Sequence, residues 1–281
     1  MRIVFLAATT FVALGSAAFA ADAGRPAPAF DWSGFYVGVN GGYGANGASV
    51  GFTPNDPNAY YGSCSGLNFA TCPPGASADI RGGLAGAQVG YNYQAGPNWV
   101  IGAEADYDWS GARGSTTSTF FLGSTGLMAF AAKQSIESFG TVRARLGYVP
   151  VSPLMIYATG GLAIGAVHES APMLPAEFGA GGADSGFGGP YGYDCELGTA
   201  ICFAGSSSKV SAGWTLGAGG EYAITSNLTF KAEYLYVDLG RASGVDSVAL
   251  NAAGAANPSS FTAKFSAASL NVVRAGLNWK F

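Results

Sequence analysis

Charged residues are scarce in this chain, and their scarcity excludes several classes of protein. Asp, Glu, Lys and Arg make up 11% of the 281 residues, less than half of the share usual in soluble domains. No run of about 18 apolar residues follows the N-terminus, which argues against membrane-spanning helices. There is no basic block and the net charge is -4, so we expect no nucleic-acid partner. A single histidine, His168, allows no His-based metal cluster within one chain.

The N-terminus has the features of a cleaved secretory signal. Arg2 gives a positive start, Ile3 to Leu14 an apolar stretch, and Ala18-Phe19-Ala20 a small-x-small cleavage site. The alternative, a short anchor helix, is disfavoured because the run is short and rich in Ala. We therefore expect a signal peptide at 1–20, a periplasmic lead-in at 21–31 and the folded domain at 32–281.

Glycine and aromatic residues are abundant, with 44 Gly and 13% aromatics, and they recur in strictly alternating segments. In 99–109, Trp and Tyr and small aliphatic residues alternate with Gly, Glu and Asp. Such alternation over about ten residues predicts a strand with one apolar and one polar face. The segments with this pattern are 35–43, 85–93, 99–109, 141–148, 154–165, 210–222, 228–236 and 269–281.

These segments predict an all-β fold, an eight-stranded antiparallel transmembrane β-barrel with up-and-down topology. Ten residues at about 3.3 Å each, tilted by about 40°, span roughly 25 Å, the height of an outer-membrane apolar band. Short turns at Gln94–Asn98, Pro150–Pro153 and Thr225–Asn227 alternate with long connections. We therefore expect four long outer loops on the outside of the membrane, at 44–82, 111–135, 169–208 and 239–267.

Three motifs resemble small outer-membrane barrels of alphaproteobacteria. They are the Asp31–Gly38 stretch DWSGFYVG, the Val142–Tyr148 strand and the Leu228–Asp238 strand. That OmpA-like family includes immunogenic surface proteins and hemin-binding proteins, and its members are often called porins. The resemblance implies location in the cell outer membrane, with lipid around the strands. The terminal Phe281 resembles the aromatic end that the barrel-assembly machinery recognises, so we expect that machinery as a partner.

Charges within the predicted strands fall on the inward face. No charge takes the lipid-facing parity, where Arg or Lys at mid-depth would cost about 2–4 kcal/mol. We expect Arg143 and Arg145 to pair with Glu104 and Asp106 on the adjacent strand, and the remaining charges to pair likewise. The predicted lumen ion pairs involve Glu104, Asp106, Arg143, Arg145, Glu221, Lys231, Glu233 and Arg274; Asp108 and Lys280 share the inward parity.

The outer loops carry residues with several possible roles. Cys64 and Cys72 in the first loop, and Cys195 and Cys202 in the third, favour two loop-internal disulfides in an exported chain, over zinc binding. His168 is interpreted as a residue at a loop base, with hemin ligation as the alternative. The third loop also holds a cluster of carboxylates, interpreted as a solvated acidic surface or, alternatively, a contact for divalent cations or a cationic partner: Glu169, Glu177, Asp184, Asp194 and Glu196.

Basic residues outside the lumen gather at the edges of the long loops. They are Arg81, Arg113, Lys133, Lys209, Arg241 and Lys264. Since the outer leaflet is lipopolysaccharide, whose phosphates suit Arg and Lys donors, we expect several of them to form a rim that contacts these phosphates. The alternative is that they are ordinary solubilising charges.

The sequence predicts a structural, surface-exposed barrel that is not an enzyme and uses no cofactor or metal. Glu104 and Asp106 could in principle act as an acid–base pair, but no nucleophile, base and orienting group stand together. Two alternatives remain. One is a small porin-like channel, since inward glycines such as Gly86 and Gly90 leave space for water-filled cavities. The other is binding or adhesion through the outer loops, to hemin or to a host or surface partner.

Overall fold

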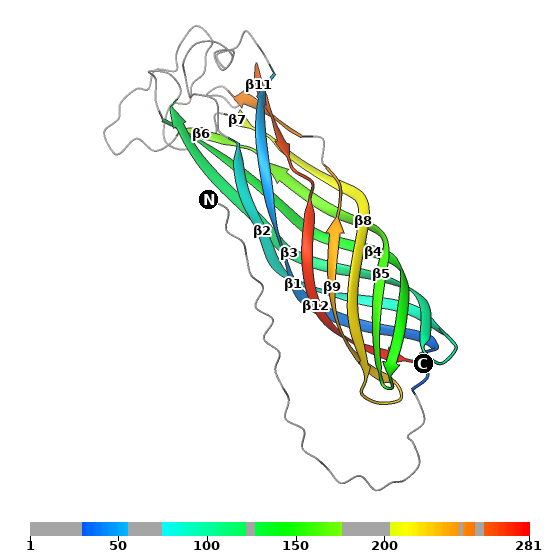
Figure 1. The fold of residues 1–281 in the computed structure, drawn as a ribbon. Helices are drawn as coiled ribbons and strands as arrows, with labels where there is room; N and C mark the ends of the chain where they lie inside the picture. Colours follow the sequence, from blue (N-terminus) through cyan, green and yellow to red (C-terminus); the bar gives the residue numbers. More distant parts are fainter. Residues whose placement is uncertain (1–29, 56–74, 122–126, 176–202, 242–243, 251–255) are drawn as a thin grey trace, which may run out of the picture.

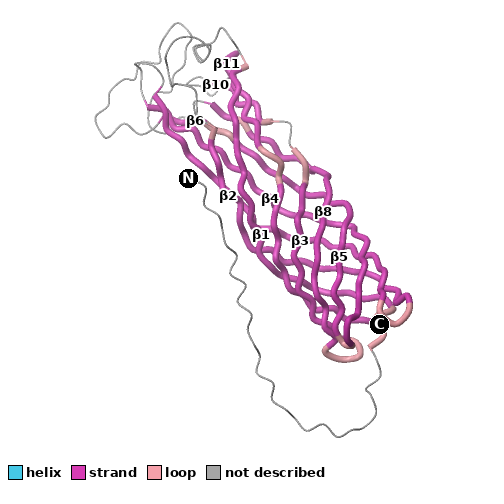
Figure 2. Tube along the Cα trace, viewed as in Figure 1, coloured by secondary structure: helices cyan, strands magenta, loops and turns pink. Residues whose placement is uncertain are grey.

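The computed structural model describes residues 30–55, 75–121, 127–175, 203–241, 244–250 and 256–281. Twelve strands make up the regular structure of these ranges (Figures 1 and 2). They are β1 (Gly34–Pro54), β2 (Ala76–Ala95), β3 (Trp99–Phe121), β4 (Leu127–Val151), β5 (Leu154–Ser170), β6 (Met173–Pro175), β7 (Phe203–Ala204), β8 (Ser206–Ala223), β9 (Leu228–Asp238), β10 (Val245–Leu250), β11 (Ala256–Phe265) and β12 (Ser269–Lys280). None of the described residues lies in a helix long and apolar enough to cross a membrane.

Eight of the strands close into a barrel in chain order. Each pairs antiparallel with the next, through β1, β2, β3, β4, β5, β8, β9 and β12, and β12 returns to β1. The closing pair places Tyr36 opposite Lys280 and Tyr43 opposite Val273. Because every strand has two neighbours, the barrel has no free edge in this zone. The predicted eight-stranded antiparallel barrel is confirmed.

The barrel continues beyond this zone, where four of its strands are interrupted. β6, β7, β10 and β11 follow or precede β5, β8, β9 and β12 after a short break, and they complete a second ring with the far halves of β1 to β4. Figure 1 shows these short strands at the end opposite the C-terminus. Backbone hydrogen bonds link the breaks, as from Ala171 N to Gly205 O at 3.0 Å and from Ala268 N to Gly240 O at 2.9 Å. We call this second ring the extension.

The outer surface of the first zone is an apolar belt between two groups of aromatic side chains. Leu162 and Val142, at mid-belt, are 67% and 63% exposed, as expected for side chains that face lipid. Exposed aromatics at the end with the short turns are Phe35, Tyr91, Tyr93, Trp99, Tyr148, Tyr222, Phe230, Trp279 and Phe281. Those at the other end of the belt are Tyr43, Tyr107, Trp109, Trp214 and Tyr234. Aromatic girdles at both interfaces are typical of outer-membrane barrels.

The predicted long loops are shorter than expected, because much of them is strand. β1 continues to Pro54 and β2 begins at Ala76, both inside the predicted 44–82 loop, and only 122–126 separates β3 from β4. Past the belt the alternation reverses its polarity. Val50 and Ile80 are buried inside, while their neighbours Ser49 and Arg81 face outward and are exposed. A strand in water needs this opposite pattern, with its apolar side chains in the interior.

Candidate functional site in the barrel lumen

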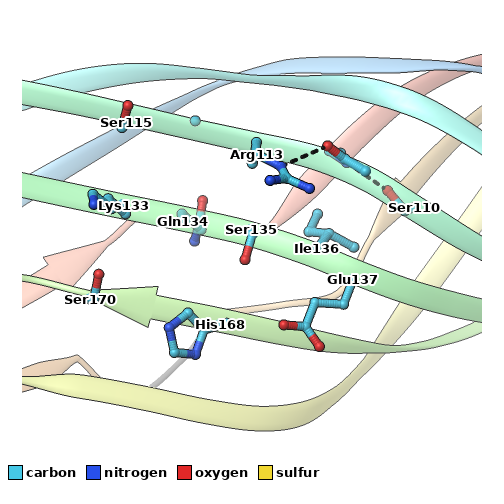
Figure 3. A pocket seen from close by; sticks show the side chains of 13 residues that line it. Ser110, Arg113, Ser115, Lys133, Gln134, Ser135, Ile136, Glu137, His168 and Ser170 are labelled. Carbon is cyan, nitrogen blue, oxygen red and sulfur yellow. Dashed lines mark hydrogen bonds between the residues drawn. The ribbon is translucent and has the colours of Figure 1, made fainter.

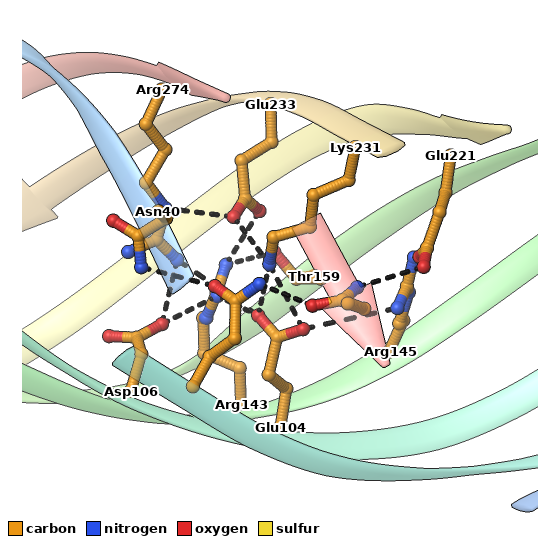
Figure 4. Close-up of polar contacts among 12 residues, drawn as sticks. Asn40, Glu104, Asp106, Arg143, Arg145, Thr159, Glu221, Lys231, Glu233 and Arg274 are labelled. Atoms are coloured by element: carbon orange, nitrogen blue, oxygen red, sulfur yellow. Dashed lines mark hydrogen bonds and ion pairs between the residues drawn. The ribbon is translucent and has the colours of Figure 1, made fainter. Parts of the chain in front are cut away.

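Charged side chains from five strands meet inside the barrel, at the level of the apolar belt (Figure 4). β3, β4, β8, β9 and β12 supply them, each from its inward face. The ion pairs join four cations, Arg143, Arg145, Lys231 and Arg274, to five carboxylates, Glu104, Asp106, Asp108, Glu221 and Glu233. All nine residues are buried, so each charge depends on its partners rather than on water.

Arg143 lies at the centre of this network. One of its terminal nitrogens, Nη2, bonds to Glu104 and lies 2.7 Å from Asp106 Oδ2. The other, Nη1, donates to Glu233 Oε2 and to Thr159 Oγ1, each at 3.1 Å. Glu104 is the register partner of Arg143 on β3, whereas Glu233 lies on β9, across the lumen. One guanidinium group therefore links opposite walls of the barrel.

Arg274 and Lys231 share the same carboxylates. Arg274 donates from Nη2 to Asp106 Oδ2 at 2.7 Å, from Nε to Glu233 Oε1 at 2.8 Å and from Nη1 to Asp108 Oδ2 at 2.5 Å. Lys231 Nζ lies 2.9 Å from Glu104 Oε1 and 3.0 Å from Glu233 Oε1. Because Glu104, Asp106 and Glu233 each pair with two or more cations, removing one of these side chains leaves several buried charges without a partner.

Arg145 forms a second centre nearer to the short turns. Its Nη2 bonds to Glu221 on β8, and Glu104 Oε2 is more distant, at 3.9 Å. Its guanidinium carbon lies 3.7 Å from the ring centroid of Tyr157, a stacking geometry that favours the cation. Arg145 makes no ion pair with Asp106 among the described residues, so the expected partnership of these two residues is wrong.

Neutral side chains complete the network, and they were not singled out from the sequence. Tyr36 donates its hydroxyl to Glu104 Oε2 at 2.7 Å, and Asn278 donates to Glu221 Oε1 at 2.8 Å. Gln88 joins Asn40 and Asn278 through bonds of 3.1 and 2.6 Å. The sequence feature that could have identified these neutral residues is their inward position in the alternating strands, which they share with the charged residues.

Two apolar layers close the lumen on either side of the charges. Toward the extension, a cluster of fully buried side chains includes Phe139, Leu235, Leu239, Leu270 and Ile136. Toward the short turns, Trp32 packs with Val100, Met155 and Tyr157. Trp32 belongs to the segment just before β1, and it is 2% exposed. The interior is therefore filled at three successive levels.

The inward glycines do not leave the space that their lack of a side chain suggested. A Cβ atom at Gly90 would overlap the Tyr36 hydroxyl, and one at Gly86 would overlap the Asp108 carboxylate. Large neighbouring side chains thus lie over these glycines and fill the volume. The expectation of water-filled cavities beside them is wrong at these two positions.

The remaining predicted residues lie away from the lumen or outside the described ranges. Cys64, Cys72, Cys195 and Cys202 lie outside them, as do Glu177, Asp184, Asp194 and Glu196. Phe281 follows β12 and is 73% exposed, with its backbone N donating to Phe35 O at 3.0 Å. Lys280 keeps its inward parity but bonds to the Asp31 carbonyl at the barrel mouth. His168 is on the outer face of β5, with Nδ1 2.7 Å from Ser208 Oγ.

Glu169 was assigned to a solvated acidic loop, and this assignment is wrong. It is an inward residue of β5, 1% exposed, and it accepts a 2.7 Å hydrogen bond from Gln134 Nε2. Burial raises the pKa of its carboxyl above the ordinary value of 4.5, against the smaller opposing effect of the Gln134 hydrogen bond. The predicted loop began at residue 169, but β5 continues to Ser170, so Glu169 lies in a strand.

The six basic residues of the predicted rim are all exposed. Arg81, Arg113 and Lys133 lie on the adjacent strands β2, β3 and β4. Lys209 is on β8 opposite Val167, Lys264 is on β11 opposite Gly51, and Arg241 follows β9. Arg81, Arg113 and Lys133 therefore form one group on neighbouring strands.

The chemistry of the lumen is that of a buried structural network. Its carboxylates are held by cations from neighbouring and opposite strands (Figure 4). In the described part of the chain, no three His, Cys, Asp or Glu side chains cluster in a way that could hold a metal ion.

The family of the chain follows from comparison with known proteins. The family model of the outer membrane protein beta-barrel domain matches residues 6–281. The chain belongs to this family. It is 36% identical to the 31 kDa outer-membrane immunogenic protein of Brucella melitensis, across 93% of this chain and 88% of that protein. It is 27% identical to the 22 kDa outer membrane protein of Rhizobium leguminosarum bv. viciae, across 75% of this chain and 66% of that protein.

This outer-membrane barrel is thus placed in the cell outer membrane, and the resemblance to alphaproteobacterial barrels is confirmed. Among solved structures, OprG of Pseudomonas aeruginosa matches with a TM-score of 0.40 at 13% identity, covering 89% of this chain and 96% of that chain. Neisserial surface protein A matches with a TM-score of 0.35 at 15% identity, covering 89% of this chain and 98% of that chain.

Proposed function

We propose that this outer-membrane barrel is a non-conducting, non-enzymatic structural protein whose filled lumen supports a surface-exposed extension. The observation that carries the proposal is the side-chain plug, defined as the charged network together with the apolar layers above and below it. In an eight-stranded barrel the interior is only just wide enough for side chains to fill. Here Arg143 and Arg274 are 1% and 2% exposed, which favours a closed barrel over the channel alternative.

The plug would serve to fix the position of the extension. Four strands, β1 to β4, run unbroken from the membrane belt into the extension, so their far ends are held at fixed positions by the packed barrel. The Brucella relative is named an immunogenic protein, a name compatible with display of such an extension at the cell surface. Binding or adhesion through this end remains the second candidate, favoured by its length beyond the belt.

Conductance across a planar lipid bilayer tests the proposal. The refolded protein should insert without producing current steps, because charged and apolar side chains block the lumen at three levels. The matched variant replaces Glu104, Arg143, Phe139 and Leu239 by Ala, which removes side chains from two of these levels. We expect current steps from this variant alone. Stable, voltage-proportional steps from the wild-type protein would show that the barrel is a channel.

A further inference from the structure

The outer face of the barrel is hollowed where β3, β4 and β5 leave the apolar belt. The pairing of β3 with β4 shifts between Trp109 and Ala112, and the pairing of β4 with β5 shifts between Ile136 and Ser138. These two bulges bend the sheet. A cavity of about 490 Å³ lies there, and outward side chains on its walls include Arg113, Ser115, Lys133, Ser135, Glu137 and His168 (Figure 3). We call it the bulge groove.

Positive charge is concentrated at one edge of the bulge groove. Arg81 and Arg113 are direct register partners on β2 and β3, and both are exposed on the outer face. Lys133 is diagonal to Arg113, since Arg113 pairs with Ser135 and Ser115 pairs with Lys133. Like charges directly opposite each other on a sheet destabilise it. None of these three cations forms an ion pair among the described residues; the nearest carboxylate along β2 is that of Asp79, two residues before Arg81 on the same exposed face.

The height of this cluster matches the headgroup layer. On β3 the apolar belt ends at Trp109, which is 64% exposed and packs edge to face with Tyr107 at 5.3 Å. Arg113 lies four residues beyond Trp109, which is about 13 Å along the strand at about 3.3 Å per residue. With the strand tilted by about 40°, the rise is roughly 10 Å. Girdle aromatics mark the membrane interface, so these cations lie just outside the hydrocarbon region.

We propose that the bulge groove binds a phosphate group of lipopolysaccharide through Arg81, Arg113 and Lys133. Guanidinium groups hold phosphate with paired, charge-assisted hydrogen bonds, and Lys adds a point charge. Ser115 and Ser135 lie between the cations and carry hydroxyl donors on the same face. The glycolipid is the source of the phosphate because its acyl chains would lie against the belt directly below. The site stands whether or not the lumen conducts ions.

Glu137 makes the two ends of the bulge groove opposite in charge. It is exposed at the membrane-side end of the groove, four residues from Lys133 along β4. An anion is repelled from that end and attracted to the end with the cations. Removing the Glu137 charge should therefore leave phosphate binding unchanged or make it tighter, which supplies a control within the same groove.

The experiment measures binding of fluorescent lipopolysaccharide to the refolded protein in dodecyl maltoside micelles, by anisotropy. The triple variant Arg81→Ala, Arg113→Ala and Lys133→Ala should lose affinity about tenfold or more, since hydrogen bonds to charged groups are the strong ones. Lipopolysaccharide stripped of its phosphates should bind the wild type as weakly as the intact glycolipid binds the triple variant. Heat-modified gel mobility reports whether each variant is folded.

Two matched variants and a second probe keep the outcome decisive. Lys264→Ala removes an exposed cation on β11, away from the groove, and Glu137→Gln removes the groove carboxylate; both should bind at least as well as the wild type. Inorganic phosphate should compete only at much higher concentration than the glycolipid. Equal affinity of wild type and triple variant, an equal loss in Lys264→Ala, or competition by inorganic phosphate as effective as that by the glycolipid would each overturn the proposal.

Discussion

Arg143 on β4 donates to Glu233 on β9 across the barrel lumen, at 3.1 Å, although β5 and β8 separate their strands in the sheet. The contact is possible only because the sheet closes on itself. It joins walls that share no backbone hydrogen bond, so the network ties the barrel together in a direction that the strand ladders do not.

Replacing Arg143 by Ala should therefore destabilise the barrel strongly. Glu104, Asp106 and Glu233 would each lose a cation in a buried site, and breaking such a pair costs about 3–5 kcal/mol. Urea unfolding followed by Trp fluorescence measures the change. Arg81→Ala, which removes an exposed Arg, should shift the free energy of unfolding by no more than about 0.5 kcal/mol. Equal effects of the two variants would contradict a structural role for the network.

A charge on the other face of the same strand should also be costly, for a different reason. Ala144 lies between Arg143 and Arg145 on β4 and faces outward at mid-belt, opposite Ala103 and Gly160. Ala144→Arg would place a cation in lipid, at a cost of about 2–4 kcal/mol. The control is Ser77→Arg, on the exposed outer face of the extension, with almost no expected cost. Urea unfolding in phosphatidylcholine vesicles compares them, and a tolerated Arg at 144 would refute the assigned lipid face.

The buried carboxyl of Glu169 should make stability depend on pH. Because burial raises its pKa in the folded state, the folded protein holds this proton more tightly than the unfolded chain. The stability that the protonated Glu169 contributes is fully present below its pKa of 4.5 in the unfolded chain. This stability is lost as the pH rises through the higher pKa of the folded protein. Glu169→Gln should remove this dependence and gain stability relative to wild type at neutral pH. Unfolding midpoints of the wild type and Glu169→Gln, measured from below pH 4.5 to neutral pH, test this pH dependence. If the midpoints of the two proteins change with pH in parallel, the assigned effect of Glu169 is contradicted.

The orientation of the barrel can be tested at two exposed positions. We expect the extension outside the cell and the short turns in the periplasm. Thr53→Cys, near the end of β1, should react with a membrane-impermeant maleimide on intact cells, and Ser226→Cys, in the turn between β8 and β9, should react only after lysis. Wild-type cells give the background from the native cysteines. Labelling of position 226 on intact cells would reverse the assigned topology.

The membrane zone could be predicted from the sequence because its outward face is apolar and its inward face polar. Trp99, Ile101 and Tyr107 alternate with Glu104 and Asp106 in an unbroken pattern. In the extension the polarity reverses, and many of the outward residues are Ser, Thr and Gly. The alternation with apolar residues outward therefore ends at the edge of the belt, although the strands continue. Bulges add to the difficulty, because they shift the parity of β4 between Ile136 and Ser138.

The partners within the lumen could be predicted only in part. Parity assigns Arg145 to the interior, and its register partner on β3 is Gly102, which offers no charge. Its partner Glu221 lies on β8, beyond β5, and reaches it through the lumen. Neighbours along the sheet follow from strand order, but contacts across the lumen depend on barrel diameter and stagger, which periodicity does not specify.

The four strand breaks are contiguous around one side of the barrel, while β1 to β4 pass the same level intact. A load applied to the extension would therefore be carried into the membrane along one continuous wall. On the opposite wall, the load crosses a line of short breaks in the strands, where neighbouring chain segments are joined by few backbone hydrogen bonds, such as Ala171 N to Gly205 O. If the extension is pulled from outside, we expect the backbone to deform first along these breaks. The extension would then bend toward β1 to β4, whose continuous strands remain anchored in the outer membrane.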